Sequence, residues 1–179
     1  MKGLTKKDAL QLFKKIDQEL EKIKKKAQVT VLGGLAIILQ DFRERSTLDI
    51  DIAPTSDAKV FVEICAKLGI QADIINLTTT VDLLNTDTVE QFSGEFLTID
   101  SIKAEDLIKS KLERFKKQDS DDIMAILDKT GISYQYFKKL VKEMMLDFVG
   151  NPRSLTLSAQ VIVERRYNNN LDDFVSSIK

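Results

Sequence analysis

Two aspartates separated by one residue stand in an otherwise apolar segment, Asp49 and Asp51 in "TLDIDIA". Residues two apart in a β-strand project to the same face of the sheet, so the pair would lie side by side while Leu48, Ile50 and Ile52 face a core. Adjacent carboxylates repel each other unless a cation lies between them. Mg²⁺ prefers oxygen ligands and keeps positions for substrate phosphates. The pair therefore predicts a divalent-cation site, and the alternative is an edge strand with both aspartates in solvent.

A third carboxylate would complete a two-metal site, and the sequence offers two candidates. Asp73 in "QADIINL" is the better one, because its neighbours alternate as in a half-buried strand. Asp82 in "TVDLLN" is the second. In a two-metal site the ions stabilise both the attacking and the leaving oxygen. Asp49, Asp51 and Asp73 are therefore the predicted catalytic and metal-binding residues, with two Mg²⁺ ions, or Mn²⁺ in their place.

Gly33 and Gly34 stand between a predicted strand and a predicted helix in "VLGGLAIIL". Glycine has no Cβ, so backbone N–H groups at such a position can approach an anion closely. A triphosphate bridged to two metal ions is a suitable anion. The alternative is a strand-to-helix turn without a ligand, since such turns often contain glycine.

The composition excludes several kinds of chemistry. The chain has 179 residues, no histidine and one cysteine, Cys65, which excludes histidine triads, histidine general bases and zinc–thiolate clusters. A net charge of −1 gives no global attraction for nucleic acid or anionic membranes. We expect Cys65 to be a core residue. The N-terminal segment lacks the apolar stretch of a signal peptide and no apolar run is long enough to span a bilayer, so we expect a cytoplasmic protein.

These residues must be positioned by alternating helices and strands in the first part of the chain. Thr5 and Asp8 predict a capping box at the start of a helix over residues 5–27. Ser56 is the expected N-cap of a later helix that stops at Gly69. The further expected elements are a helix in "GLAIILQDF", strands in "QVTVLG", "STLDIDIAP", "IQADIINL" and "EFLTID", and only helices from residue 101 onward. Residues 78–95 remain ambiguous. The fold class is α/β (α+β), with a mixed-sheet domain over residues 1–100 and a C-terminal helical bundle over residues 101–179.

The motifs together resemble the polymerase-β-like nucleotidyltransferase superfamily, in which an apolar residue and Gly-Gly or Gly-Ser precede Asp-x-Asp. The closer similarity is to the small prokaryotic branch near the AbiEii-like toxins, whose members read like "GG-x-A … R-x-T-x-D-I-D". The matching residues are Gly33, Gly34, Ala36, Arg45, Thr47, Asp49, Ile50 and Asp51. A second segment, "AEDLIKSKLERFKKQDSDDIMAIL", is similar to that branch's helix pair through Asp106, Lys111, Arg114, Asp119 and Asp122. The resemblance covers about residues 28–130.

This resemblance implies a nucleotidyltransferase fold and a metal-dependent enzyme that moves an NMP from an NTP to an acceptor hydroxyl. Gly33, Gly34, Arg45, Thr47 and Lys111 are the implied nucleotide-binding residues. RNA, especially a tRNA end, is the acceptor implied by the toxin branch, and a cognate antitoxin or toxin is the implied protein partner. The alternative functions are a non-catalytic binding module or antitoxin partner of the same fold, and a nucleotide-binding regulator.

The basic residues have alternatives of their own. Arg45 either contacts phosphate or forms a structural salt bridge, and Lys111 either contacts the substrate or lies on a solvated helix face. The lysines of the first helix form either a solvated face or an RNA-binding strip.

Overall fold

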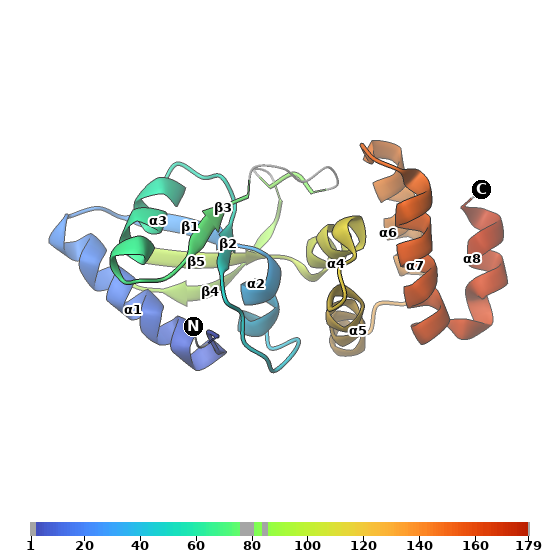
Figure 1. The fold of residues 1–179 in the computed structure, drawn as a ribbon, viewed down its shortest axis with the longest axis horizontal. Helices are drawn as coiled ribbons and strands as arrows, with labels where there is room; N and C mark the ends of the chain where they lie inside the picture. The colour runs from blue at the N-terminus through green and yellow to red at the C-terminus, as the bar shows by residue number, and fades with distance from the viewer. Residues whose placement is uncertain (1–2, 76–80, 84–85, 179) are drawn as a thin grey trace. The chain divides into compact units, whose positions relative to one another are not determined.

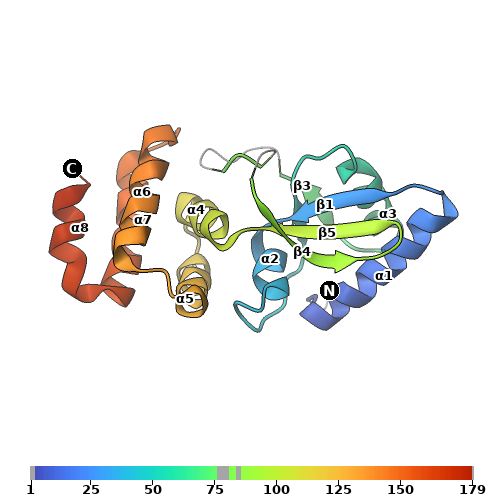
Figure 2. The same ribbon diagram turned by 180° about the vertical axis from the view of Figure 1, so that it is seen from behind.

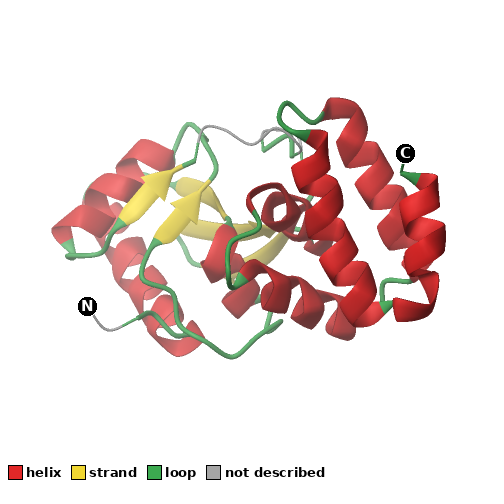
Figure 3. Cartoon of the chain, turned by 45° about the vertical axis from the view of Figure 1, so that its right-hand side comes forward, coloured by secondary structure: helices red, strands yellow, loops and turns green. Residues whose placement is uncertain are grey.

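The computed structural model describes residues 3–75, 81–83 and 86–178. The chain divides into two compact units. The first unit comprises Met1–Leu77 and Leu83–Lys103, and the second comprises Thr78–Asp82 and Ala104–Lys179. Within the described residues every strand belongs to the first unit, and the second unit is helical (Figure 3). This mixed α/β organisation, with helices following the sheet, confirms the predicted fold class.

A five-stranded mixed sheet forms the centre of the first unit, in the order β3-β2-β1-β5-β4 (Figures 1 and 2). The strands are β1 (Ala27–Val31), β2 (Ile50–Ile52), β3 (Ala72–Ile74), β4 (Thr88–Ser93) and β5 (Leu97–Ile102). β1 runs parallel to β5 and antiparallel to β2, which runs parallel to β3. β4 is an antiparallel edge strand on β5.

The apolar residues of β1, β2 and β5 alternate with polar ones, so one face of the sheet faces the core. Val29, Ile50 and Ile99 are fully buried on that face. The helices α1 (Lys6–Lys22) and α3 (Ala58–Lys67) contact the sheet and each other. The opposite face carries the polar members of the alternation, among them Asp51. The period of two therefore separates a hydrophobic core from a polar sheet face.

The helix α1 begins as the sequence predicts. Thr5 is its N-cap, and Thr5 and Asp8 form the reciprocal bonds of a capping box. The helix ends at Lys22, earlier than the predicted residue 27, because Lys24 adopts a left-handed conformation and Ala27 already begins β1.

Two local predictions are wrong. Leu48 was expected in the core, but it is 62% exposed, because β2 begins only at Ile50 and Leu48 lies in the bend before it. Ser56 was expected to cap α3, but the N-cap is Asp57 and its carboxylate accepts a hydrogen bond from the backbone N–H of Gln28 at 2.9 Å. Of the ambiguous region 78–95, residues 88–93 form β4, while 78–80 and 84–85 lie outside the described residues. The last two residues of the predicted strand "IQADIINL", 76–77, lie outside them as well.

The second unit contains five α-helices in its described part. These are α4 (Ala104–Arg114), α5 (Asp119–Thr130), α6 (Tyr134–Asp147), α7 (Pro152–Arg166) and α8 (Leu171–Ser177), with a short 3₁₀ turn, η1 (Asn168–Asn170), before α8. Gly131, at φ +68°, ends α5, and Ser133 caps α6. Pro152 opens α7, where its fixed φ suits the first turn. Phe137, Ile162 and Phe174 are fully buried and form part of the core of this unit.

Candidate nucleotidyltransferase site

Gly33 brings the start of the helix α2 (Gly33–Leu39) against the carboxylate of Asp51. Its backbone has φ +56°, a conformation that glycine adopts at little cost. A Cβ built on Gly33 would lie only 2.6 Å from Oδ2 of Asp51. The backbone N–H of Leu32 donates to the carbonyl of Asp51 at 2.8 Å, which fixes this approach. Any side chain at residue 33 would therefore displace the Asp51 carboxylate.

Gly34 makes a second close approach, to the loop that leads into β2. A Cβ at Gly34 would lie 2.9 Å from Oγ1 of Thr47 and 3.0 Å from Nη2 of Arg45. Because Gly33 and Gly34 have no side chains, three polar side chains can approach the beginning of α2 closely. Arg45, Thr47 and Asp51, which the sequence separates from the glycines by more than ten positions, are brought to one place.

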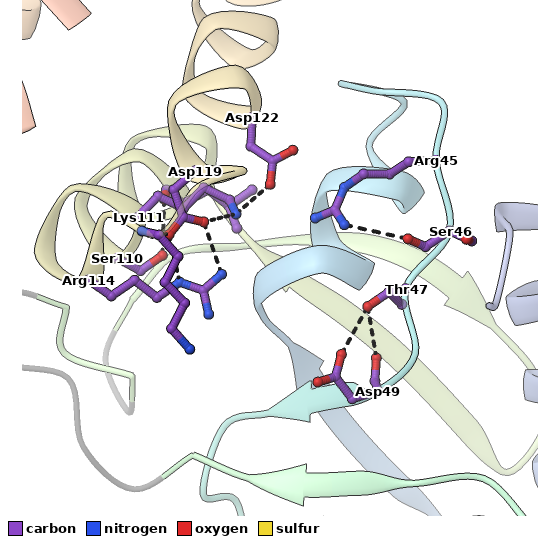
Figure 4. Close-up of polar contacts among 11 residues, drawn as sticks. Arg45, Ser46, Thr47, Asp49, Ser110, Lys111, Arg114, Asp119 and Asp122 are labelled. Atoms are coloured by element: carbon purple, nitrogen blue, oxygen red, sulfur yellow. Dashed lines mark hydrogen bonds and ion pairs between the residues drawn. The ribbon is translucent and has the colours of Figure 1, made fainter. Parts of the chain in front are cut away.

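Thr47 holds the first aspartate of the pair. Its hydroxyl donates to Oδ1 of Asp49 at 3.0 Å (Figure 4). Thr47 itself is buried and is fixed by a backbone bridge to Leu4, with bonds of 2.6 and 3.0 Å between their N–H and carbonyl groups. Asp49 is exposed and lies in the bend just before β2. A buried threonine therefore orients a carboxylate that remains open to solvent.

Asp73 lies directly beside Asp51 on the neighbouring strand. In the parallel pair of β2 and β3 the Cα partners are Asp51 and Asp73. Paired residues of parallel strands project to the same face, so both carboxylates belong to the polar face. Asp73 is exposed, and its Oδ2 accepts a hydrogen bond from Nε2 of Gln71 at 2.9 Å. Asp82, the other candidate, belongs to the segment Thr78–Asp82 of the second unit.

The carboxylates do not form a closed metal cage. Over residues 3–75, 81–83 and 86–178, no three acidic or cysteine side chains gather closely enough to hold one metal ion. Strand pairing orders Asp51 and Asp73, whereas the hydroxyl of Thr47 orients Asp49. Their assignment as metal ligands stays a prediction.

One acidic residue on the polar face was not singled out from the sequence. Asp100 on β5 is only 5% exposed, and its Oδ2 accepts a hydrogen bond from Nε2 of Gln28 at 2.6 Å. It pairs with Thr30 of β1, whose side chain shares the face of Asp51. The alternation in "FLTID" was the available signal, since the aspartate stands where the polar face continues.

Lys111 lies in the second unit, inside a network of charges. The side chain is 1% exposed, and its Nζ lies 3.1 Å from Oδ1 of Asp119 and 2.7 Å from Oδ2 of Asp122 (Figure 4). Arg114 donates to both oxygens of Asp119 at 3.1 and 3.0 Å, and the N–H of Lys116 donates at 2.7 Å. Lys111 is therefore not on a solvated helix face, and its role as a nucleotide contact stays a prediction.

Electrostatics in this network favour ionised Asp119. Burial alone would raise the pKa of this carboxyl, but the charges of Lys111 and Arg114 and the bond from Lys116 outweigh burial and hold the pKa below its usual value. The network thus joins the end of α4 to the first turn of α5 through charge-assisted hydrogen bonds.

A comparison with known families bears directly on this arrangement. Residues 10–170 match the profile of a family described as "Nucleotidyltransferase of unknown function (DUF6036)". The chain belongs to this family. The match spans the glycines, the aspartates of the first unit and the Lys111 network of the second. No curated protein matches the chain.

Family membership confirms the nucleotidyltransferase superfamily and, at that level, a transferase that uses a nucleotide substrate. The comparison does not bear on the expected proximity to the AbiEii-like toxins. Among its described residues, this nucleotidyltransferase has no helix whose length and hydropathy would suit a membrane span.

Proposed function

We propose that the protein is a metal-dependent nucleotidyltransferase that moves an NMP from an NTP to an acceptor hydroxyl. The observation that carries the proposal is the approach of Gly33 to Asp51, where a Cβ would lie 2.6 Å from the carboxylate oxygen. The backbone at Gly33 lies so close to the acidic residue Asp51 that no side chain has space there. This arrangement suits a ligand that contacts both main-chain N–H groups and carboxylates. A nucleoside triphosphate with its cation has this combination of charges.

The residues present fit a Mg²⁺ ion in their chemistry. Asp49 and Asp51 would hold it, since both supply carboxylate oxygens, and Asp73 would complete a site for a second ion from the adjacent strand. Mn²⁺ accepts the same ligands. When bound, the cation would neutralise phosphate charge and lower the pKa of the acceptor hydroxyl.

The chain's own residues orient the reaction around that site. Gly33 and Gly34 allow the triphosphate to reach the backbone N–H groups at the start of α2, and Arg45 and Thr47 flank it. Asp73 accepts the proton of the acceptor hydroxyl. The acceptor oxygen then forms a bond to the α-phosphorus, the bond from that phosphorus to the bridging oxygen breaks, and pyrophosphate leaves. Within the second unit, Lys111 fixes α4 to α5 through its ion pairs, and its role as a nucleotide contact stays a prediction.

The proposal also names an acceptor and a cellular role. RNA, including a tRNA end, is the proposed acceptor, and a cognate antitoxin or toxin is the proposed protein partner. Both rest on the similarity of the Gly-Gly and Asp-x-Asp motifs to the AbiEii-like branch.

A second candidate function has one observation in its favour. Because the described residues contain no group of three acidic side chains around a common point, a binding module of the same fold that transfers nothing is the alternative. Such a module would act as one half of a toxin–antitoxin pair.

One experiment distinguishes the nucleotidyltransferase from the binding module. The protein is incubated with each α-³²P-labelled NTP, Mg²⁺ and total RNA, beside the double variant Asp49→Asn/Asp51→Asn and the control Glu21→Gln on the exposed face of α1. We expect label transfer by the protein and the control but not by the double variant. Transfer that persists in the double variant contradicts the mechanism. Protein and small-molecule acceptors are tested in parallel incubations, and if none of these acceptors nor the RNA is labelled, the result favours the binding module.

A further inference from the structure

The loop between α2 and β2, residues 40–49, carries three of the side chains that the proposed function assigns to the nucleotide and its cation. Arg45, Thr47 and Asp49 follow one another along this loop (Figure 4). Residues 40–49 are all described, and apart from one isolated bridge none of them belongs to a helix or a strand. Such a backbone keeps one conformation through its contacts with neighbouring segments. The contacts of the loop therefore decide where these three side chains lie.

The chain just before α1 holds the far end of this loop. The N–H of Leu4 donates to the carbonyl of Thr47 at 2.6 Å, and the N–H of Thr47 donates to the carbonyl of Leu4 at 3.0 Å. A Cβ built on Gly3 would collide with Oγ of Ser46, so this part of the chain packs closely against the loop. Because the hydroxyl of Thr47 donates to Oδ1 of Asp49, the bridge to Leu4 also helps to orient that carboxylate.

Lys6, in the first turn of α1, holds the near end of the same loop. Its ammonium donates to the carbonyl of Leu39 at 2.8 Å and to Oδ2 of Asp41 at 2.7 Å. Leu39 is the last residue of α2, where the helix dipole favours a cation. Asp41 has φ +57°, a left-handed conformation that costs free energy for a residue with a Cβ. One ammonium group thus stabilises both the end of α2 and the turn that starts the loop.

The position of α2 depends on the same contact. This helix has seven residues and begins at Gly33, so a shift at Leu39 is carried along the helix to the glycines of the site. Lys6 therefore supports the site by two routes, through α2 to Gly33 and through the loop to Thr47. Its ammonium is bonded to Leu39 and Asp41, so Lys6 acts through these two elements and not as a contact of the nucleotide.

We propose that Lys6 is a positioning residue, which holds α2 and the loop 40–49 in the arrangement that binds the nucleotide. The inference rests on the proposed function. The ion pair of Lys6 and Asp41 has side chains that are 38% and 61% exposed, and pairs of this kind contribute little to overall stability. Small displacements of binding groups, in contrast, weaken a site strongly. Loss of Lys6 should therefore affect the order of the loop and the affinity for the nucleotide more than the free energy of unfolding.

The test compares Lys6→Met with two controls in the full chain. Lys7→Met removes the same charge from the next residue of α1, so it measures the effect of charge alone. Lys138→Met breaks a similar lysine–aspartate pair, to Asp173 at 2.7 Å, which joins α6 to α8 in the second unit. Lys6→Arg keeps a cationic donor at residue 6 and should restore the contact.

Two measurements are made on each variant. Hydrogen exchange of the amides in residues 40–49 follows the order of the loop without a ligand. Displacement of a labelled ATP analogue in the presence of Mg²⁺ follows the affinity for the nucleotide. Urea unfolding shows that each variant is folded under the conditions used.

We expect the amides of residues 40–49 to exchange about fivefold faster in Lys6→Met, and the ATP analogue to bind about five- to tenfold more weakly. Lys7→Met and Lys138→Met should match the unchanged protein in both measurements, and Lys6→Arg should recover most of the affinity. Three results would overturn the inference: unchanged exchange of the loop in Lys6→Met, faster exchange with unchanged affinity, or equal weakening in either control.

Hydrogen exchange distinguishes failure of this inference from failure of the proposed function, because it needs no ligand. If the protein binds the nucleotide and the loop of Lys6→Met exchanges as before, the proposed function stands and the positioning role of Lys6 is wrong. If the unchanged protein binds no nucleotide, the proposed function fails, and faster exchange in Lys6→Met then shows only that Lys6 holds the loop.

Discussion

Replacing Gly33 by alanine tests the site at the contact on which it depends. Gly33 has φ +56°, and an added Cβ would lie 2.6 Å from Oδ2 of Asp51. Two effects follow. An alanine in the left-handed region costs about 1–2 kcal/mol of stability, and the carboxylate of Asp51 must move to relieve the contact.

Gly69 provides a matched control for the first effect. Its φ is +73°, but nothing lies within 4 Å of an added Cβ. Gly69→Ala should therefore lose a similar amount of stability without any displacement near the site. Each kcal/mol corresponds to a fall in Tm of about 2–4 °C for a chain of this size. The two variants should then unfold at similar urea concentrations and temperatures.

Binding of ATP and Mg²⁺ distinguishes them. We expect Gly33→Ala to bind the nucleotide at least tenfold more weakly, since a misplaced carboxylate removes about 1.4 kcal/mol or more of interaction. Gly69→Ala should bind as the unchanged protein does, at a temperature where both variants remain folded. If Gly33→Ala binds normally while showing the same loss of stability as Gly69→Ala, the proposed nucleotide site beside Gly33 and Asp51 is refuted.

Three other predictions concern buried groups. Lys111→Met removes the cation between two buried carboxylates and should lower the free energy of unfolding by about 3–5 kcal/mol. The control Lys139→Met, on the surface of α6, should lower it by at most about 1 kcal/mol. Urea unfolding measures both losses, and equal losses would contradict a buried network. The folded-state pKa of Asp119 lies below the ordinary value of 3.8, so its contribution to stability is present above that pH and is lost as the pH falls through the folded-state pKa. Asp119→Asn should therefore flatten the acid limb of the stability profile, and an unchanged limb would exclude this carboxyl as its source. Burial raises the pKa of the Cys65 thiol to about 12, so a thiol reagent should react at neutral pH only as the protein unfolds, and rapid labelling of the native protein would show that the thiol is accessible.

The sequence determined most elements of the first unit because their signals are local. The capping box of Thr5 and Asp8, the helix stop at Gly69 and the strand character of "QVTV" and "FLTID" depend on neighbouring residues, and the structure confirms each of them. The end of α1 and the start of β2 were misplaced by several residues, since the point where a helix or strand stops depends on what packs against it.

The superfamily was also readable from the sequence, because the glycines and the aspartate pair recur as short motifs, and the family match over residues 10–170 confirms it. Their mutual positions were not readable. The close contact that a Cβ on Gly33 would make with Asp51, at 2.6 Å, joins a helix to a strand, and the register that pairs Asp51 with Asp73 joins two strands. Only the sheet order decides which of these elements are neighbours.

Burial of charge was decided by the tertiary structure alone. A lysine on an amphipathic helix is usually solvated, and nothing in the spacing of Lys111 indicates otherwise. The folded chain places it between Asp119 and Asp122, which offset the cost of removing a charge from water. The types and spacing of the residues thus determined what chemistry the chain can perform. The packing of distant segments decided which of those residues meet, because a contact between them exists only once the chain is folded.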